Sequence, residues 1–169
     1  MLLTLKDKLL NWLINSFVLA QQKIRFQLAN ESVGISRYTS QEAKKLYGQE
    51  IPSIPLGASL LFPLPSPIIN HPSSVATVLS VSRITPYKGF HHLIKAIKKT
   101  GKKVNLIIVG SAPQPQYLAY LEKIKTPTTK IFINPSDKKL SELYQNCDFY
   151  ASCDRFLFFG MPPLEAALL

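Results

Sequence analysis

The chain has 169 residues, of which 46% are hydrophobic and 18% are charged, a composition that is typical of a folded globular protein and excludes a disordered one. Lys and Arg outnumber Asp and Glu by twenty to ten, which gives a formal net charge of +10. This excess favours partners that carry phosphate, such as nucleotides, nucleic acids or an anionic membrane surface, with a merely solvated basic surface as the alternative. Cys147 and Cys153 lack CxxC spacing and lie near no histidine cluster, so we expect no metal site and a reducing compartment.

The N-terminal segment is apolar over residues 9–20, a stretch that is too short to span a membrane. Apolar residues recur there every three or four positions, which predicts a helix with one apolar stripe: Leu2, Leu5, Leu9, Leu13 and Phe17. Three interpretations stay open, namely a helix that packs on the protein, a helix on a membrane surface, and a signal sequence. The second is favoured by nearby basic residues, which are Lys6, Lys8, Lys23 and Arg25. We expect a cytoplasmic protein, with peripheral contact at the inner face of the membrane as the alternative.

A small structural unit follows this helix. Residues 32–36 predict a short buried strand, and residues 41–47 predict a helix. Thr39 or Ser40 is the expected N-cap of that helix, and Gly48 is its expected end.

Prolines then recur through residues 52–74, which predicts extended chain without regular structure. We interpret this segment as a linker. It separates residues 1–51, the remnant of a first domain, from residues 75–169, a second domain.

The second domain has a regular pattern of apolar strands and amphipathic helices. Expected strands cover residues 75–81, 104–109, 130–133 and 147–152; helices are expected around residues 90–97, 117–124 and 140–144, with a last one that begins at Pro162. Alternating strands and helices predict an α/β fold, in which a Rossmann-like parallel sheet carries helices on both faces. Right-handed connections give the strand order third, second, first, fourth.

This topology also predicts where a ligand binds. In such sheets the crevice lies at the carboxyl ends of the strands, where the strand order reverses, here between the first and the fourth strand. The loop after the first strand carries Arg83 and Lys88, and the segment after the fourth carries Gly160 and Glu165. Two cations and a helix N-terminus suit a diphosphate, and a carboxylate suits ribose hydroxyls.

At these residues the chain resembles a known family. The segments SVSRITPYKGFHHLIKAI, LIIVGSAP, LSELYQNCDFYAS and FFGMPPLEAA are similar to the donor-binding half of retaining glycosyltransferases of the family-4 type (group 1), which have the GT-B fold. The resemblance covers roughly residues 30–169. It implies a GT-B C-terminal half that is truncated at its C-terminus, and it makes residues 1–51 what is left of the acceptor-binding half.

The resemblance also implies a role for each site residue. Arg83 and Lys88 would bind the donor diphosphate, and Glu165 would hold the nucleotide ribose. The loop of Gly160, Met161 and Pro162 would bring backbone N–H groups near the sugar and phosphate. The donor would be a UDP- or GDP-type nucleotide sugar, with no cofactor and no metal.

One departure from the family concerns catalysis. Position 157, where the family has an acid near the donor sugar, is Leu157. An apolar side chain can neither stabilise a developing positive charge nor bind sugar hydroxyls. The catalytic residues therefore stay unassigned, with Asp154 and Glu165 as weak candidates.

Three hypotheses for function remain. The first is a glycosyltransferase that moves a sugar from a nucleotide-diphosphate donor to an unknown acceptor with retention, a partner subunit or an oligomer supplying the rest of the fold. The second is a donor-binding module or truncated remnant without catalysis, which Leu157 favours. The third is a basic nucleic-acid-binding protein on a Rossmann-like scaffold, which no reader motif supports.

Overall fold

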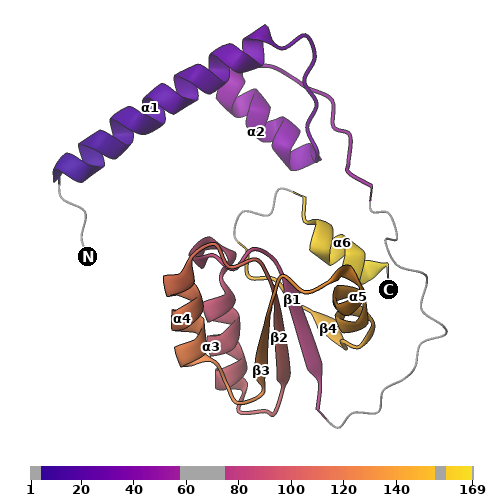
Figure 1. Ribbon diagram of the computed structural model, residues 1–169. Helices are drawn as coiled ribbons and strands as arrows, with labels where there is room; N and C mark the ends of the chain where they lie inside the picture. The colour runs from indigo at the N-terminus through magenta and orange to yellow at the C-terminus, as the bar shows by residue number, and fades with distance from the viewer. Residues whose placement is uncertain (1–4, 58–74, 155–158, 169) are drawn as a thin grey trace. The chain divides into compact units, whose positions relative to one another are not determined.

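The computed structural model describes residues 5–57, 75–154 and 159–168, with side chains from residue 10 onward. The chain divides into two compact units, Met1–Gly57 and Ala58–Leu169, which we call the first and the second unit (Figure 1). Most of the predicted linker, residues 58–74, lies outside the described residues, and so does Leu157.

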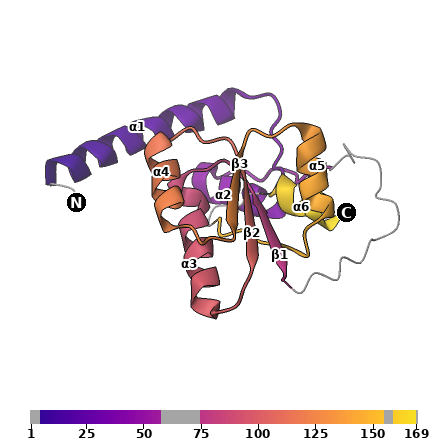
Figure 2. The same ribbon diagram turned by 60° about the horizontal axis from the view of Figure 1, so that its bottom comes forward.

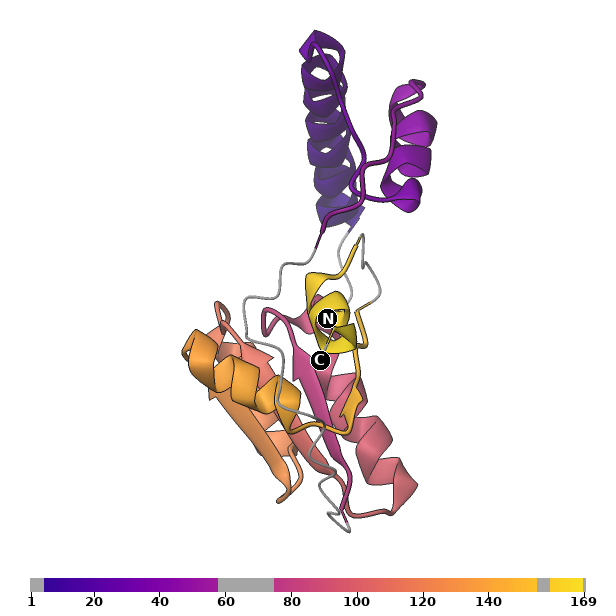
Figure 3. The ribbon, with the colours of Figure 1, turned by 90° about the vertical axis from the view of Figure 1, so that its right-hand side faces the viewer.

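The first unit consists of two helices that lie side by side (Figure 3), α1 (Leu5–Leu28) and α2 (Arg37–Tyr47). The ring of Phe26 stacks on that of Tyr47 with 4.6 Å between centroids, and the Tyr47 hydroxyl donates to Gln22 at 3.4 Å. Further toward its N-terminus, α1 exposes large apolar side chains, among them Trp12 and Phe17. None of the described helices is both long and apolar enough to cross a membrane.

The start of α2 corrects the predicted cap. The cap is Ser36, whose hydroxyl accepts from the Thr39 N–H at 3.1 Å while the Thr39 hydroxyl accepts from the Ser36 N–H at 2.9 Å. Thr39 thus completes a capping box from inside the helix, and the prediction of Thr39 or Ser40 as the cap was wrong. The predicted end is confirmed, because Gly48 adopts a left-handed conformation with φ 76°.

The prediction of a strand over residues 32–36 is also wrong. That strand reduces to a single parallel bridge between Gly34 and Ser53. The side chains of Val33 and Ile35, which would form the apolar face of a strand, are exposed, so the segment does not bury that face. Ser36 is already taken up as the helix cap.

The second unit contains a four-stranded parallel sheet in the order β3-β2-β1-β4, as predicted. Its strands are β1 (Thr77–Val81), β2 (Asn105–Gly110), β3 (Thr129–Ile133) and β4 (Phe149–Tyr150). The β1–β2 register pairs Thr77 with Asn105 and Val81 with Val109.

Helices cover both faces of this sheet (Figures 1 and 2): α3 (Phe90–Thr100) and α4 (Pro115–Ile124) on one, α5 (Asp137–Gln145) and α6 (Met161–Ala167) on the other. Alternate residues of β2 face opposite ways, so Leu106 and Ile108 join the core under α3 and α4, whereas Val109 joins the core under α5. The predicted inner face of α3 is confirmed, since its four members are buried: Phe90, Leu93, Ile94 and Ile97.

The fourth strand is shorter than the predicted 147–152. Before it, the Asp148 carboxylate accepts from the Thr77 N–H at 2.7 Å, and the Asp148 N–H donates to the Thr77 carbonyl at 2.9 Å. Beyond it, the Ala151 N–H still donates to the Leu79 carbonyl at 2.9 Å. One side-chain bond and two backbone bonds therefore extend the pairing where the regular ladder stops.

Two glycines let the loops above the sheet approach each other closely. A Cβ on Gly110 would lie 1.8 Å from the Ser82 carbonyl oxygen, so the ends of β1 and β2 meet there only without a side chain. Gly89, with φ 76°, precedes α3, and a Cβ on it would lie 2.6 Å from the carbonyl oxygen of Cys153. Gly89 therefore joins the loop after β1 to the segment after β4.

We predict that Gly89→Ala destabilises the protein by about 2–4 kcal/mol, because it adds a steric clash to the strain of a positive φ. Gly101→Ala is the matched control, because Gly101 has φ 64° and open space where a Cβ would point; it should cost only about 1–2 kcal/mol. Urea unfolding of both variants measures the difference. Equal losses would mean that the contact between Gly89 and Cys153 does not constrain the fold.

Candidate functional site

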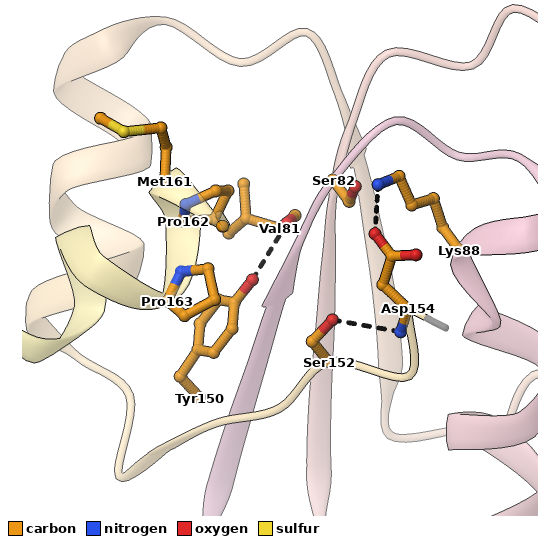
Figure 4. A pocket seen from close by; sticks show the side chains of 10 residues that line it. Val81, Ser82, Lys88, Tyr150, Ser152, Asp154, Met161, Pro162 and Pro163 are labelled. Atoms are coloured by element: carbon orange, nitrogen blue, oxygen red, sulfur yellow. Dashed lines mark hydrogen bonds and ion pairs between the residues drawn. The ribbon is translucent and has the colours of Figure 1, made fainter. Parts of the chain in front are cut away.

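A pocket of about 230 Å³ lies at the carboxyl ends of β1 and β4, beside the start of α6 (Figure 4). Its lining residues come from the loop after β1, from β4 and the segment after it, and from α6: Val81, Ser82, Lys88, Tyr150, Ser152, Asp154, Gly160, Met161, Pro162 and Pro163. β2 and β3 lie on one side of β1 and β4 on the other, so this is where the strand order reverses. Five residues named from the sequence are thus in one lining: Lys88, Gly160, Met161 and Pro162, which were expected to bind the donor, and Asp154, a candidate catalytic residue.

A buried ion pair occupies one side of the pocket. Lys88, at the end of a short 3-10 helix (Pro86–Lys88), places its ammonium on the carboxylate of Asp154. The Lys88 side chain is 15% exposed and that of Asp154 is 2% exposed. The Lys88 nitrogen also lies 5.1 Å from the centroid of the Tyr87 ring.

Lys88 and Asp154 were both named from the sequence as candidate site residues, but the ion pair between them was not predicted. Their chain segments, after β1 and after β4, meet only because of the strand order and the Gly89–Cys153 contact. The Asp154 N–H donates to the Ser152 hydroxyl at 3.3 Å, which ties this segment to the end of β4.

The opposite side of the pocket is the start of α6. Gly160 precedes the helix with φ 86°, and the Leu164 N–H donates back to the Gly160 carbonyl at 3.4 Å. Pro162 and Pro163 have no N–H, so the backbone donors that this turn can offer are those of Gly160 and Met161. A phosphate or sugar oxygen between Lys88 and this turn would meet a cation on one side and N–H groups on the other.

Tyr150 lies at the base of the pocket and was not predicted as a site residue. Its hydroxyl donates to the Val81 carbonyl at 3.1 Å, and burial raises its pKa to about 12. An aromatic residue at the end of a strand carries no sequence signal for this role, because its partner is a carbonyl of another strand.

Glu165 and Arg83, the other two predicted site residues, are not in the pocket lining. The Glu165 carboxylate accepts a hydrogen bond from the Tyr144 hydroxyl of α5 at 2.8 Å. The pKa of Tyr144 is raised, mainly because the side chain is buried and secondly because of this hydrogen bond. Arg83 follows β1 with an exposed side chain.

No group of three or more His, Cys, Asp and Glu residues in the described part of the chain is arranged to hold a metal ion. His91 and His92 lie at the start of α3, where the His91 ring is hydrogen-bonded to the Tyr117 hydroxyl at 2.8 Å. His91 belongs to the packing of α3 on α4, and His92 is exposed.

Comparison with known proteins identifies what this architecture is similar to. Residues 66–168 match the family model of glycosyl transferases group 1. No curated protein sequence matches the chain. Among solved structures, the apo form of the lipopolysaccharide outer core galactosyltransferase WaaB resembles this chain with a TM-score of 0.63 at 18% sequence identity. The likeness covers 83% of this chain and 41% of that chain, and at this identity it concerns the fold. The expected Rossmann-like fold of the GT-B type is thereby confirmed.

We predict an alkaline loss of stability that depends on Tyr150. Its pKa is raised in the folded chain from 10.0 to about 12, so its stabilising contribution is complete below pH 10 and is lost as pH rises toward 12. At neutral pH, Tyr150→Phe should be less stable by about 1 kcal/mol, because one hydrogen bond is lost. Urea unfolding at successive pH values should show this difference shrink between pH 10 and 12.

Tyr120→Phe on α4 is the matched control, because that side chain is 40% exposed. Its stability should stay parallel to that of the unaltered chain across the same pH range. A constant difference for Tyr150→Phe as well would contradict the role of the buried hydroxyl.

Proposed function

The chain belongs to the group 1 glycosyltransferase family, and we propose that its second unit binds a nucleotide-diphosphate sugar in the pocket between β1 and β4. The observation that carries this proposal is the meeting of Lys88 with the Gly160–Met161 turn in one lining at the switch point of the sheet. That arrangement suits a diphosphate, which needs a cation and N–H donors together.

The proposed reaction is transfer of the sugar to an acceptor hydroxyl with retention, as in glycosyltransferases of the family-4 type. The bond from the anomeric carbon to the diphosphate oxygen breaks, and its electron pair leaves with the diphosphate. The acceptor oxygen forms the new bond on the same face of the sugar and releases its proton. Negative charge grows on the leaving diphosphate, so Lys88 and the N–H groups of Gly160 and Met161 would stabilise the transition state.

Arg83 and Glu165 take the outer contacts in this proposal. The side chain of Arg83 is exposed in the same loop as Lys88, so it can turn toward a bound diphosphate. Glu165, held by Tyr144, offers its carboxylate to the ribose hydroxyls. A UDP- or GDP-type donor meets all of these groups.

A second candidate function is donor binding without transfer. It is favoured by Leu157, which stands where the family has an acid near the donor sugar. Turnover of the donor distinguishes the two candidates, since sugar transfer or donor hydrolysis that Glu165→Ala abolishes would exclude a purely binding role.

We predict that the purified chain binds one of UDP, GDP and ADP saturably in a calorimetric titration, and that Lys88→Ala and Arg83→Ala each weaken this binding by about tenfold or more. Lys98→Ala is the matched control, because it removes the same charge from the exposed face of α3. Thermal unfolding of each variant confirms that it is folded. Unchanged affinity in both site variants would contradict the assignment of the site.

We also propose that α1 contacts an anionic membrane surface. Trp12 is 63% exposed and Phe17 is 65% exposed, and Lys23 and Arg25 follow on the same helix. Trp12 is the single tryptophan of the chain, so its fluorescence reports on this helix alone. Its emission should shift to the blue with anionic lipid vesicles and stay constant with neutral ones; constant emission with both would contradict the proposal.

A further inference from the structure

The charges inside the pocket cancel each other. Of the described residues that line it, Lys88 and Asp154 are the two that carry a formal charge, and they are paired. The lining therefore has no net charge, although the whole chain has a net charge of +10. An anion that approaches Lys88 meets a cation whose charge an internal carboxylate already neutralises.

This carboxylate is held in place by the fold. Its side chain is 2% exposed, and its own N–H is bonded to Ser152 at the end of β4. The preceding residue, Cys153, is packed against Gly89, next to Lys88 in the chain. Asp154 therefore competes for Lys88 as a tethered group, at an effective concentration that a small free anion does not reach in solution.

We propose that Asp154 determines which anions occupy the site: its pairing with Lys88 keeps small free anions from binding measurably, whereas a nucleoside diphosphate still binds. Free phosphate or pyrophosphate can displace the carboxylate only through its charge and its hydrogen bonds to N–H groups, which a nucleoside diphosphate makes as well. A nucleoside diphosphate adds contacts of its ribose and base, and these supply the free energy to separate the pair. The inference rests on the proposed role of Lys88 in binding the donor diphosphate.

The pair also explains why a carboxylate is tolerated beside a phosphate site. Like charges at close range oppose binding, so an aspartate next to a bound phosphate weakens every anionic ligand. The weakening is the same for each diphosphate at this position, so it leaves the ratio of their affinities unchanged. It lowers binding below a measurable level only for a ligand that lacks other contacts, and it thereby decides which anions occupy the site at a given concentration.

The test is a calorimetric titration of the full chain with inorganic pyrophosphate and, separately, with UDP and GDP. The unaltered chain should bind pyrophosphate weakly, and Asp154→Asn should bind it at least about tenfold more tightly. Asp154→Glu, which keeps the charge, should bind pyrophosphate as weakly as the unaltered chain. If Asp154→Asn does not fold, Asp154→Ser tests the same change with another neutral side chain.

Glu122→Gln is the matched control, because Glu122 is exposed on α4, where it pairs with Lys125 just after the helix, and the change removes one negative charge from the surface. It changes the net charge of the protein as Asp154→Asn does and should leave pyrophosphate binding unchanged. Equal pyrophosphate affinity in the unaltered chain and in the folded neutral variants would overturn the proposal. A gain of the same size in Glu122→Gln would overturn it too, because the effect would then be one of overall charge.

Failure of the proposed function gives a different result. If no nucleotide binds the unaltered chain while Asp154→Asn gains pyrophosphate binding, the donor assignment fails and the control of Lys88 by Asp154 stands. If a nucleotide binds the unaltered chain and Asp154→Asn gains no affinity for pyrophosphate, the donor site stands and the role of Asp154 is overturned.

Discussion

The pairing of β4 with β1 is the constraint on which the site depends. The regular part of β4 is only two residues long, yet it opens the crevice by placing a fourth strand on the side of β1 that β2 leaves free. Other contacts hold this short strand: Asp148 binds the start of β1, the Tyr150 hydroxyl binds the carbonyl of Val81, and Cys153 packs on Gly89. Together they bring the loop of Lys88 and the segment of Asp154 to one place.

The electrostatics of the pocket favour selectivity over affinity. A buried ion pair gives little net stabilisation, because desolvation of both charges offsets their attraction. Lys95, Lys98 and Lys99 lie on the exposed face of α3, so part of the positive charge of the protein is spread over the surface. In the pocket, by contrast, Lys88 is paired with Asp154, and an anionic ligand has to replace that carboxylate. The other contacts of the ligand therefore decide whether it binds.

The sequence predicts what depends on local periodicity and on general rules of topology. The apolar spacing of α3 identified its buried face, and right-handed connections identified the strand order. The sequence-based prediction failed at Ser36, which was predicted to end a strand and is in fact the N-cap of α2. The sequence did not pair Lys88 with Asp154, because their contact joins the loop after β1 to the segment after β4, which are far apart along the chain. Such contacts follow from the folded sheet and not from any spacing along the chain.

The side of the pocket that the start of α6 forms depends on the hydroxyl group of Tyr144. α6 has seven residues, too few to be stable alone, and it is attached to the sheet through Ala166 in the core under α5 and through Tyr144. The Tyr144 hydroxyl lies 2.8 Å from the Glu165 carboxylate and 3.4 Å from the Pro162 carbonyl oxygen. The side chain that orients Glu165 thus also positions the turn of Gly160 and Met161. The diphosphate and ribose contacts of the proposed site are therefore coupled through α5, and a change in Tyr144 acts on both.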